Sequence, residues 1–434
     1  MVLPNRILRI WMIPLVTCTQ YFIQLKAPST VEALLQSDDT VKAIHHLRPF
    51  VEKAFSFGSF EGFSGSFDSD VLARLRKNPL VEEITPDIVV KTCNKDARLG
   101  DRASVGISSR YESQHDAPRH LARLSSREAL DGDTDSYQYH YPREYQGANV
   151  DVYVIDTGIQ CDNIEFEGRC SFGKDFTGEG PGDNNGHGTH VSGIIGSKSY
   201  GVAKKINLID VKALDRTGTG SLSSIISGIE FAVNHYKETN SSRKAIINLS
   251  IGAFRNSVLN RAVEVAFKSG LVLVVAAGNS NIDACATSPA SAKYAITVGA
   301  IDDKDDKLAG FSNWGRCVNV LASGVRVISV NAKGMGPLML SGTSMSTPSV
   351  TGLVGLLLES GISPEDVKQR LKEAATMGAV PRLSLMMRPI TPNRIAYLPY
   401  GGIDHERYDP YHVDVDAGEP STRYQSAATD NLGH

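Results

Sequence analysis

Three polar residues lie in sequence surroundings that suit acid–base and nucleophilic chemistry. Asp156 follows an apolar run, His187 stands between two glycines, and Ser344 stands among small residues before an apolar segment. An imidazole that titrates near neutral pH can act as a general base. A serine at the start of a helix exposes its hydroxyl group and its backbone N–H together. The chain order Asp, His, Ser is one of those in which a catalytic triad for acyl transfer occurs.

Each of these residues alone has a simpler interpretation. An aspartate after a strand is often a turn residue, and a serine before a helix is by default an N-cap. His187 and His190 are three positions apart, which would suit a metal pair, but no glutamate lies between them as in zinc peptidases. We therefore expect a structural role for His190 and no metal at this pair.

Asn279 adds a fourth element, because an amide at the end of a buried apolar strand can donate a hydrogen bond to an oxyanion. With it, the four motifs resemble those of subtilisin-like serine proteases, nearest the proteinase K-like branch. The likeness covers about residues 20–398. It implies that Asp156 orients His187, which acts as general base and then acid. It also implies that Ser344 is the nucleophile, and that its backbone N–H and Asn279 form the oxyanion hole.

Strand and helix patterns alternate along the second half of the chain, which predicts an α/β fold with a mostly parallel sheet and helices on both faces. The resemblance implies a subtilisin-like catalytic domain over residues 117–398. Residues 20–92 have the pattern of a small α+β unit and resemble the ferredoxin-like inhibitory prodomain of these proteases. The near-continuous apolar runs of the predicted sheet are 150–155, 207–214, 245–251, 271–277 and 295–298.

Three further segments complete the predicted organisation. Residues 1–19 combine arginines, a short apolar stretch and small residues, which is typical of a secretory signal peptide, although an N-terminal strand or a short anchor is the alternative. Residues 93–116 are polar and predict an exposed linker that contains the processing site. The prodomain would present its last strand to the active site. Residues 399–434 form a polar tail without periodicity.

Composition excludes two classes of protein. Lys and Arg total 45 against 48 Asp and Glu, without a long basic stripe, so nucleic acid is not expected as a partner. No apolar run reaches about 18 residues, which argues against stable membrane insertion. In an oxidising compartment Cys161–Cys170 and Cys285–Cys317 could form disulfides, with buried free thiols as the alternative. The resemblance favours Cys285–Cys317, because some relatives pair these positions.

The resemblance also implies how a peptide substrate binds. The segment 217–222 would pair with an extended peptide, and residues 250–253 would form the opposite wall of the specificity pocket. Because these positions include no carboxylate, we expect cleavage after apolar residues. The expected substrate-binding residues are Gly220, Ser221, Leu222, Ser250, Ile251, Gly252, Ala253, Ala276, Ala277 and Gly278.

The hypothesis is therefore a secreted serine endopeptidase, made as a zymogen with its own prodomain as inhibitor and acting on proteins or peptides. The alternative is a self-cleaving pseudo-protease that keeps its prodomain and acts as a binding protein. No cofactor is expected. Asn319 stands where calcium-binding relatives carry aspartate, and a neutral amide is a poorer calcium ligand, so we expect weaker calcium dependence than in relatives with aspartate there. The acidic residues of 302–306 predict a solvated turn.

Overall fold

The structure, a computed structural model, describes most of the chain between residues 20 and 399. The predicted signal peptide, residues 1–19, and residues 400–434 of the predicted tail lie outside the described residues. None of the helices in the described part is long and apolar enough to cross a membrane. The described ranges are 20–36, 47–99, 106–107, 111–130, 137–239, 242–334 and 336–399.

The described residues of the N-terminal unit form a four-stranded antiparallel sheet, two α-helices and a short 3-10 helix. The strands and α-helices follow in the chain order strand, helix, strand, strand, helix, strand. The sheet order β2-β3-β1-β4 is that of a ferredoxin-like fold, so the α+β prediction is confirmed. Its core contains Ile23, Phe63 and Leu72. The elements are β1 (Gln20–Leu25), α1 (Val31–Gln36), η2 (Arg48–Phe50), β2 (Val51–Phe57), β3 (Phe60–Ser66), α3 (Ser69–Leu75) and β4 (Val81–Pro86).

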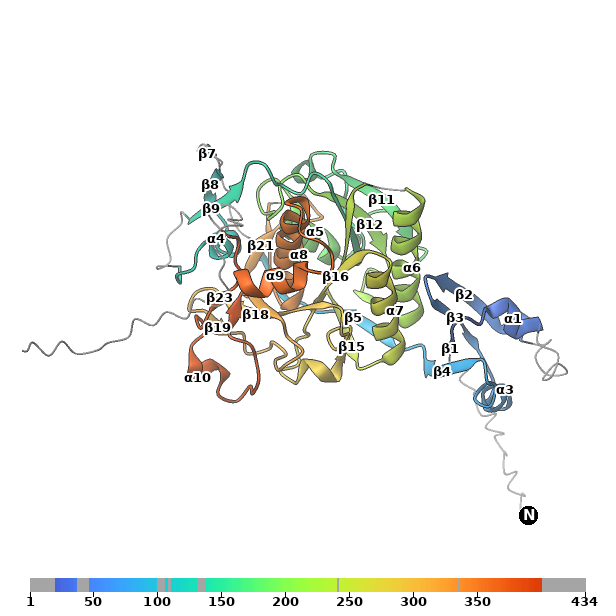
Figure 1. Ribbon diagram of the computed structural model, residues 1–434. Helices are drawn as coiled ribbons and strands as arrows, with labels where there is room; N and C mark the ends of the chain where they lie inside the picture. The colour runs from blue at the N-terminus through green and yellow to red at the C-terminus, as the bar shows by residue number, and fades with distance from the viewer. Residues whose placement is uncertain are drawn as a thin grey trace, which may run out of the picture. The chain divides into compact units, whose positions relative to one another are not determined.

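A large, mostly parallel sheet forms the body of the second unit (Figure 1). Its order is β11-β12-β10-β14-β16-β18-β20-β24-β23, and only β19 and β23 run antiparallel to their partners among the described strands. The strands are β10 (Val150–Asp156), β11 (Cys170–Asp175), β12 (Asn207–Lys212), β14 (Lys244–Leu249), β16 (Leu271–Ala276), β18 (Ile296–Asp302), β19 (Lys307–Leu308), β20 (Val320–Ser323), β23 (Thr376–Met377) and β24 (Arg394–Ile395).

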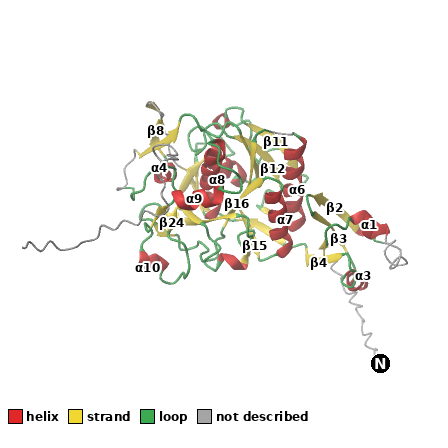
Figure 2. Cartoon of the chain, in the orientation of Figure 1, coloured by secondary structure: helices red, strands yellow, loops and turns green. Residues whose placement is uncertain are grey.

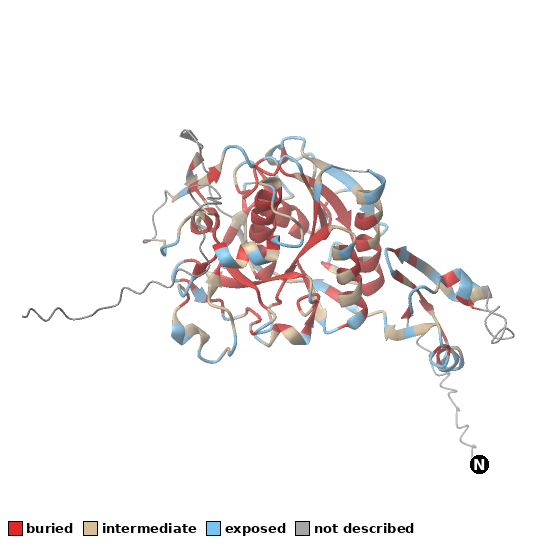
Figure 3. Ribbon diagram, in the orientation of Figure 1, coloured by how far each residue is buried: buried red, intermediate tan, exposed pale blue. Residues whose placement is uncertain are grey.

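Helices cover both faces of this sheet, as the alternating pattern predicts (Figure 2). Successive residues of a strand point to opposite faces. Val152 and Val154 of β10 share a core with α5 (His187–Gly196) and α8 (Thr343–Glu359). Tyr153 and Ile155 share the other core with α6 (Leu222–Glu238) and α7 (Ser257–Lys268). Figure 3 shows the sheet and α8 as the most continuously buried part of the molecule.

Shorter elements surround the large sheet. Two of the small sheets join segments far apart in the sequence, whereas a third joins three consecutive strands. Their strands are β5 (Val89–Thr92), β6 (Lys95–Leu99), β7 (Gly106–Ile107), β8 (Tyr111–Ala117), β9 (Tyr137–Pro142), β13 (Thr219–Ser221), β15 (Ile251–Phe254), β17 (Thr287–Ser288), β21 (Val327–Ser329) and β22 (Leu338–Ser341). The short helices are α4 (Arg119–Ser125), η3 (Ile164–Phe166), η4 (Ala284–Ala286), α9 (Val367–Ala374) and α10 (Arg382–Leu385).

The segment 93–116 was expected to be an exposed linker, but its described residues, 93–99, 106–107 and 111–116, lie largely in paired strands. Strand β6 pairs with β22, and β8 pairs with β9. Gln114 is buried, and its amide donates to the carbonyl group of Ser199 and accepts from the Lys204 ammonium. Polar composition indicates exposure only where the backbone lacks partners. Strand β22, the partner of β6, lies far along the chain, so the local sequence of the segment does not reveal this pairing.

Both expected cysteine pairs are disulfide-bonded, Cys161 to Cys170 and Cys285 to Cys317. Among the described cysteines only Cys93 is free. The second bond closes a segment of 32 residues that joins the loop after β16 to the approach to β20. It therefore links the ends of two sheet strands.

The acidic turn at 302–306 is only partly solvated, and here the prediction was wrong. Asp303 accepts a hydrogen bond from the Arg119 guanidinium at 2.9 Å, and Asp306 binds Arg123 through two bonds of 2.8 and 2.9 Å. Arg123 and Asp306 are both buried. The arginines of α4 thus neutralise the carboxylates, which the local sequence 302–306 cannot reveal.

Removing one member of this buried pair should strongly destabilise the fold. We expect Asp306→Ala to lower the free energy of unfolding by about 3–5 kcal/mol, because Arg123 would stay buried without its counter-ion. The matched change Asp305→Ala removes the exposed ion pair with Lys307 and should cost less than about 1 kcal/mol. Urea denaturation of the inhibited protein measures both. Equal losses would contradict the assignment of Asp306 as the structural residue.

Candidate active site

The aspartate and the histidine of the predicted triad meet at the carboxyl edge of the large sheet. Asp156 is the last residue of β10 and His187 is the first of α5. His187 Nδ1 and Asp156 Oδ1 are 2.7 Å apart, and neither side chain is exposed. The same oxygen accepts the Thr157 backbone N–H at 2.8 Å. This contact fixes the orientation of the imidazole, as a general base requires.

Asp183, which the sequence analysis did not single out, holds the turn that presents His187. Its carboxylate accepts hydrogen bonds from the backbone N–H groups of Gly186 and Thr189 and from the Thr157 hydroxyl group, at 2.8 to 2.9 Å. Gly186 adopts a left-handed conformation with φ of 103°. An aspartate four residues before the histidine, in a turn of small polar residues, was the available signal.

Ser344 is the second residue of α8, beside the end of β14. Its hydroxyl group donates to the Ser250 carbonyl group at 2.8 Å and accepts the Cys93 N–H at 3.0 Å. His187 Nε2 is buried and has no hydrogen-bond partner among the described residues. The serine and the histidine are therefore not joined here, and the hydroxyl group must turn from Ser250 before the histidine can accept its proton.

The polar residues Ser346, Ser349 and Thr351, which follow Ser344 on α8, are all buried and form hydrogen bonds within the protein. The Ser346 hydroxyl group donates to the Thr343 carbonyl group at 3.0 Å, and that of Thr351 donates to Asn248 Oδ1 at 2.7 Å. Ser349 bonds to a carbonyl group of its own helix. None of these three hydroxyl groups forms a hydrogen bond with Ser344, so they take no part in the chemistry of the site.

Asn279 and the Ser344 backbone bind one carbonyl oxygen together. The oxygen of Cys93 accepts from Asn279 Nδ2 at 2.7 Å and from the Ser344 N–H at 3.3 Å. Asn279 Oδ1 accepts from the backbone and the hydroxyl group of Thr343, which turns the NH₂ group toward Cys93. Two donors aimed at one carbonyl oxygen form the geometry of an oxyanion hole.

The residues before Cys93 lie as an extended strand between two walls of the site. Strand β5 pairs antiparallel with β13 on one side, with Val90 opposite Gly220. It pairs antiparallel with β15 on the other side, with Lys91 opposite Gly252. Val90 is fully buried in the core shared with α6 and α7. The expected binding segments around Ser221 and Ser250–Ala253 thus both contact an extended peptide.

A cavity of about 340 Å³ lies beside Cys93. Of the expected pocket residues Gly252, Ala253 and Gly278 line it, whereas Leu222, Ile251, Ala276 and Ala277 are buried and do not. Burial raises the pKa of the Cys93 thiol to about 12, so this group is uncharged in the site. The sequence analysis missed the lining residues Phe254, Ser280, Ile282, Thr287 and Asn313. Phe254 and Ser280 directly follow the predicted residues Ala253 and Asn279, and the other three lie further along the chain.

His190 and Asn319 have structural contacts. His190 Nε2 lies 2.9 Å from the Leu338 carbonyl oxygen and 3.2 Å from that of Val327, and burial lowers its pKa to about 3. Asn319 Oδ1 accepts the Thr297 N–H at 2.9 Å, which ties two sheet strands together. Among the described residues no group of three His, Cys, Asp or Glu side chains could hold a metal ion.

Two family models match the chain over ranges that agree with this geometry. The model of the subtilase family matches residues 147–389, which contain Asp156, His187, Asn279 and Ser344. The model described as peptidase inhibitor I9 matches residues 21–93. The second match therefore ends at the residue whose carbonyl oxygen lies between Asn279 and Ser344.

Individual proteins give the same result. The chain is 41% identical to subtilase-type proteinase RRT12 of Saccharomyces cerevisiae, covering 94% of this chain and 87% of that protein. It is 35% identical to subtilisin-like protease 1 of Arthroderma otae, covering 82% and 71%. Among solved structures, a cold adapted subtilisin-like serine proteinase matches with a TM-score of 0.59 and 36% identity, covering 66% of this chain and 99% of the other.

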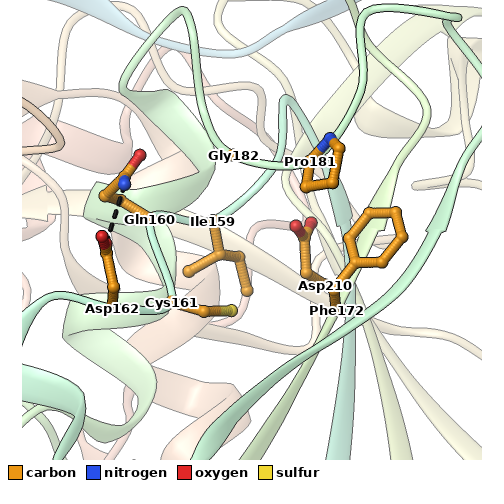
Figure 4. A pocket seen from close by; sticks show the side chains of 8 residues that line it. All are labelled: Ile159, Gln160, Cys161, Asp162, Phe172, Pro181, Gly182 and Asp210. Carbon is orange, nitrogen blue, oxygen red and sulfur yellow. Dashed lines mark hydrogen bonds between the residues drawn. The ribbon is translucent and has the colours of Figure 1, made fainter.

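Strand β12, next to the strand of Asp156, carries a second buried carboxylate. Figure 4 shows Asp210 directed toward Pro181 and Gly182, with Phe172 beside it, in a cavity of about 230 Å³. Asp210 is 1% exposed, and neither oxygen has a hydrogen-bond partner of normal geometry among the described residues. Burial raises the pKa of Asp210 to about 7. The ionised carboxylate is therefore unfavourable in the folded protein.

Replacing Asp210 by asparagine should stabilise the protein in a pH-dependent way. The folded-state pKa lies above the unfolded one, so the wild type loses stability as pH rises from about 4 to 7, whereas the variant does not titrate there. We expect the stability difference to grow to about 4 kcal/mol at most by pH 8. Asp215→Asn is the control, because hydrogen bonds from Thr217 and Thr219 lower the pKa of Asp215 and the sign reverses. A difference independent of pH would contradict the assignment.

Proposed function

Since this chain belongs to the subtilase family and is a serine endopeptidase, we propose that it is secreted as a zymogen and cuts its own precursor between Cys93 and Asn94. One observation carries the proposal. The Cys93 carbonyl oxygen accepts hydrogen bonds from Asn279 and Ser344, as the reacting carbonyl group of a substrate would. The end of the inhibitor-family match at residue 93 supports the same bond independently.

The contacts support a defined sequence of steps. Ser344 Oγ attacks the Cys93 carbonyl carbon while His187 Nε2 takes the hydroxyl proton, and Asp156 stabilises the resulting imidazolium. Asn279 and the Ser344 N–H bind the oxyanion. Collapse of the intermediate breaks the bond to Asn94, whose amine takes the proton from His187. Water then attacks the acyl-enzyme with His187 as base, which releases Cys93 as a carboxylate.

The prodomain is expected to stay bound after the cut, because most of its contacts do not involve the scissile bond. Phe55, Phe57 and Phe60 belong to the same buried core as α6 and α7. The Ser56 N–H donates to Glu230 at 2.7 Å, and the Asp87 carboxylate accepts from Ser223. Cutting in place needs no encounter between molecules, and the product remains an inhibitor in the cleft.

The substrates we propose are extended polypeptide segments with an apolar residue before the scissile bond. Backbone pairing with β13 and β15 makes few demands on sequence. The cavity beside Cys93 is lined by Ala253, Ile282 and Thr287 among others, and none of its described lining residues is a carboxylate. A lysine or arginine side chain would therefore lose hydration there without gaining a counter-ion. Calcium is not part of the proposed mechanism.

The proposed processing can be tested with three variants. Ser344→Ala should leave a full-length precursor, because loss of the nucleophile costs about 10⁶ in turnover. Asn279→Asp keeps the acceptor for Thr343 but loses the donor to the oxyanion, so processing should slow by about 10²–10³. Ser349→Ala, on the same helix but away from the reaction, is the control and should process normally. Mass spectrometry of the wild-type product should find Asn94 as the new N-terminus.

Cleavage of Ser344→Ala at the same bond, in a host without other proteases, would show that processing is not autocatalytic. A processed wild-type protein that still hydrolyses no added peptide after its prodomain has been removed would instead favour the binding-protein alternative. Size and activity are therefore measured on the same sample.

The proposed preference for apolar residues before the scissile bond can be tested with a peptide library. In a peptide library, we expect apolar residues before the scissile bond to exceed lysine and arginine by at least about tenfold in kcat/KM. Ser280→Asp places a carboxylate at the exposed rim of the cavity and should raise cleavage after lysine and arginine selectively. A wild-type profile dominated by basic residues would overturn the proposed pocket.

A further inference from the structure

We propose that the processed enzyme has a binding subsite for a carboxylate at the seventh residue before the scissile bond of its substrates, formed by the N–H and the hydroxyl group of Ser223. The inference rests on the proposed function, since it treats the end of the prodomain as a substrate in place. With Cys93 as the first residue before the bond, Asp87 is the seventh. Its carboxylate binds Ser223.

The backbone from Cys93 back to Ile88 follows the enzyme without a break. The Cys93 N–H donates to the Ser250 carbonyl group at 3.3 Å, and the Thr92 N–H donates to that of Gly218 at 3.1 Å. Strand pairing with β13 continues through Val89 opposite Ser221. The Leu222 N–H then donates to the Ile88 carbonyl group at 2.9 Å. The register set at the scissile bond therefore extends to the residue beside Asp87.

At that point the carboxylate of Asp87 makes two hydrogen bonds to one residue. Oδ1 accepts the Ser223 N–H at 2.9 Å, and Oδ2 accepts the Ser223 hydroxyl group at 2.6 Å. Ser223 is buried while Asp87 is in place. A substrate that follows the same backbone path would bring its own seventh side chain to this position.

The start of helix α6 contributes no negative charge that would repel a carboxylate at Ser223. Ser221 is the N-cap of the helix, and the Ser221 hydroxyl group accepts the N–H of Ser224. The Ser221 hydroxyl group also lies 2.8 Å from the Ser223 hydroxyl group, but it does not bond to the Ser223 N–H, which is left to the carboxylate. The first turn of α6, all of it described, contributes no acidic residue. The N-terminal end of a helix of 17 residues favours a negative charge. Once the prodomain leaves, the Ser223 N–H and the helix end are open to another carboxylate.

Helix α7 offers a comparison that separates substrate binding from prodomain binding. Its first residue, Ser257, donates to the carboxylate of Glu83. Glu83 belongs to β4 of the prodomain sheet and not to the extended segment in the cleft. A peptide bound like β5 would therefore reach Ser223 and would not reach Ser257.

The test uses the processed enzyme from which the prodomain has been removed, and three peptides. The peptides keep residues 88–94, with Leu in place of Cys93, and carry Asp, Asn or Lys at the first position. We expect the Asp peptide to exceed the Asn peptide about fivefold in kcat/KM, mainly through KM, and the Lys peptide to be poorest. The preference should weaken with added salt, because this contact lies near the protein surface. Ser223→Ala should reduce the ratio of Asp to Asn to about twofold or less. Ser257→Ala should leave it unchanged.

The outcomes distinguish this inference from the proposed function. Equal cleavage of the Asp and Asn peptides, or an unchanged ratio in Ser223→Ala, would overturn the subsite while leaving the protease intact. Loss of the ratio in Ser257→Ala as in Ser223→Ala would also overturn it, because the effect would then not come from the backbone path. Failure to cleave any of the three peptides would overturn the proposed function itself.

Discussion

Strand β5 lies between β13 and β15, and its pairing with both of them decides which carbonyl group reaches Asn279. A strand fixed on two edges cannot shift by one residue without turning every side chain to the opposite face. Val90, fully buried in the core beneath the cleft, adds the same constraint through packing. The donors of the oxyanion hole thus act on one bond, because the register excludes its neighbours.

The parts of this arrangement that follow from the sequence are those whose signals are local. Asp156 ends an apolar strand, and His187 and Ser344 each begin a helix, so each has a recognisable motif. A mostly parallel sheet collects strand ends at one edge, which explains why motifs so far apart in the chain meet. The predicted fold is confirmed for the same reason: alternating strands and helices leave few topologies.

The features that the sequence did not reveal depend on partners distant in the chain. The polar segment 93–116 resembled a linker, since nothing local indicates the pairing of β6 with β22 or of β8 with β9. The acidic sequence around Asp303 and Asp306 is typical of a solvated turn. In the structure, Arg119 and Arg123 neutralise these two carboxylates. Cys93 has no recognisable motif around it in the sequence. Its role in the cleft follows from the register of β5, which no motif encodes.

In the proposed processing step, the contacts that hold the bond after Cys93 in the site also oppose release of the cleaved prodomain. Breaking the bond after Cys93 leaves the pairing of β5, the hydrogen bonds to Asp87 and the packing of Phe55, Phe57 and Phe60 in place. Dissociation would expose these aromatic side chains to water, at about 25 cal/mol for each Å² of apolar surface. In the proposed mechanism, control of activity therefore lies in the stability of the prodomain and its interface. Cleavage disconnects the inhibitor from the enzyme, and the cleft opens only when the prodomain dissociates.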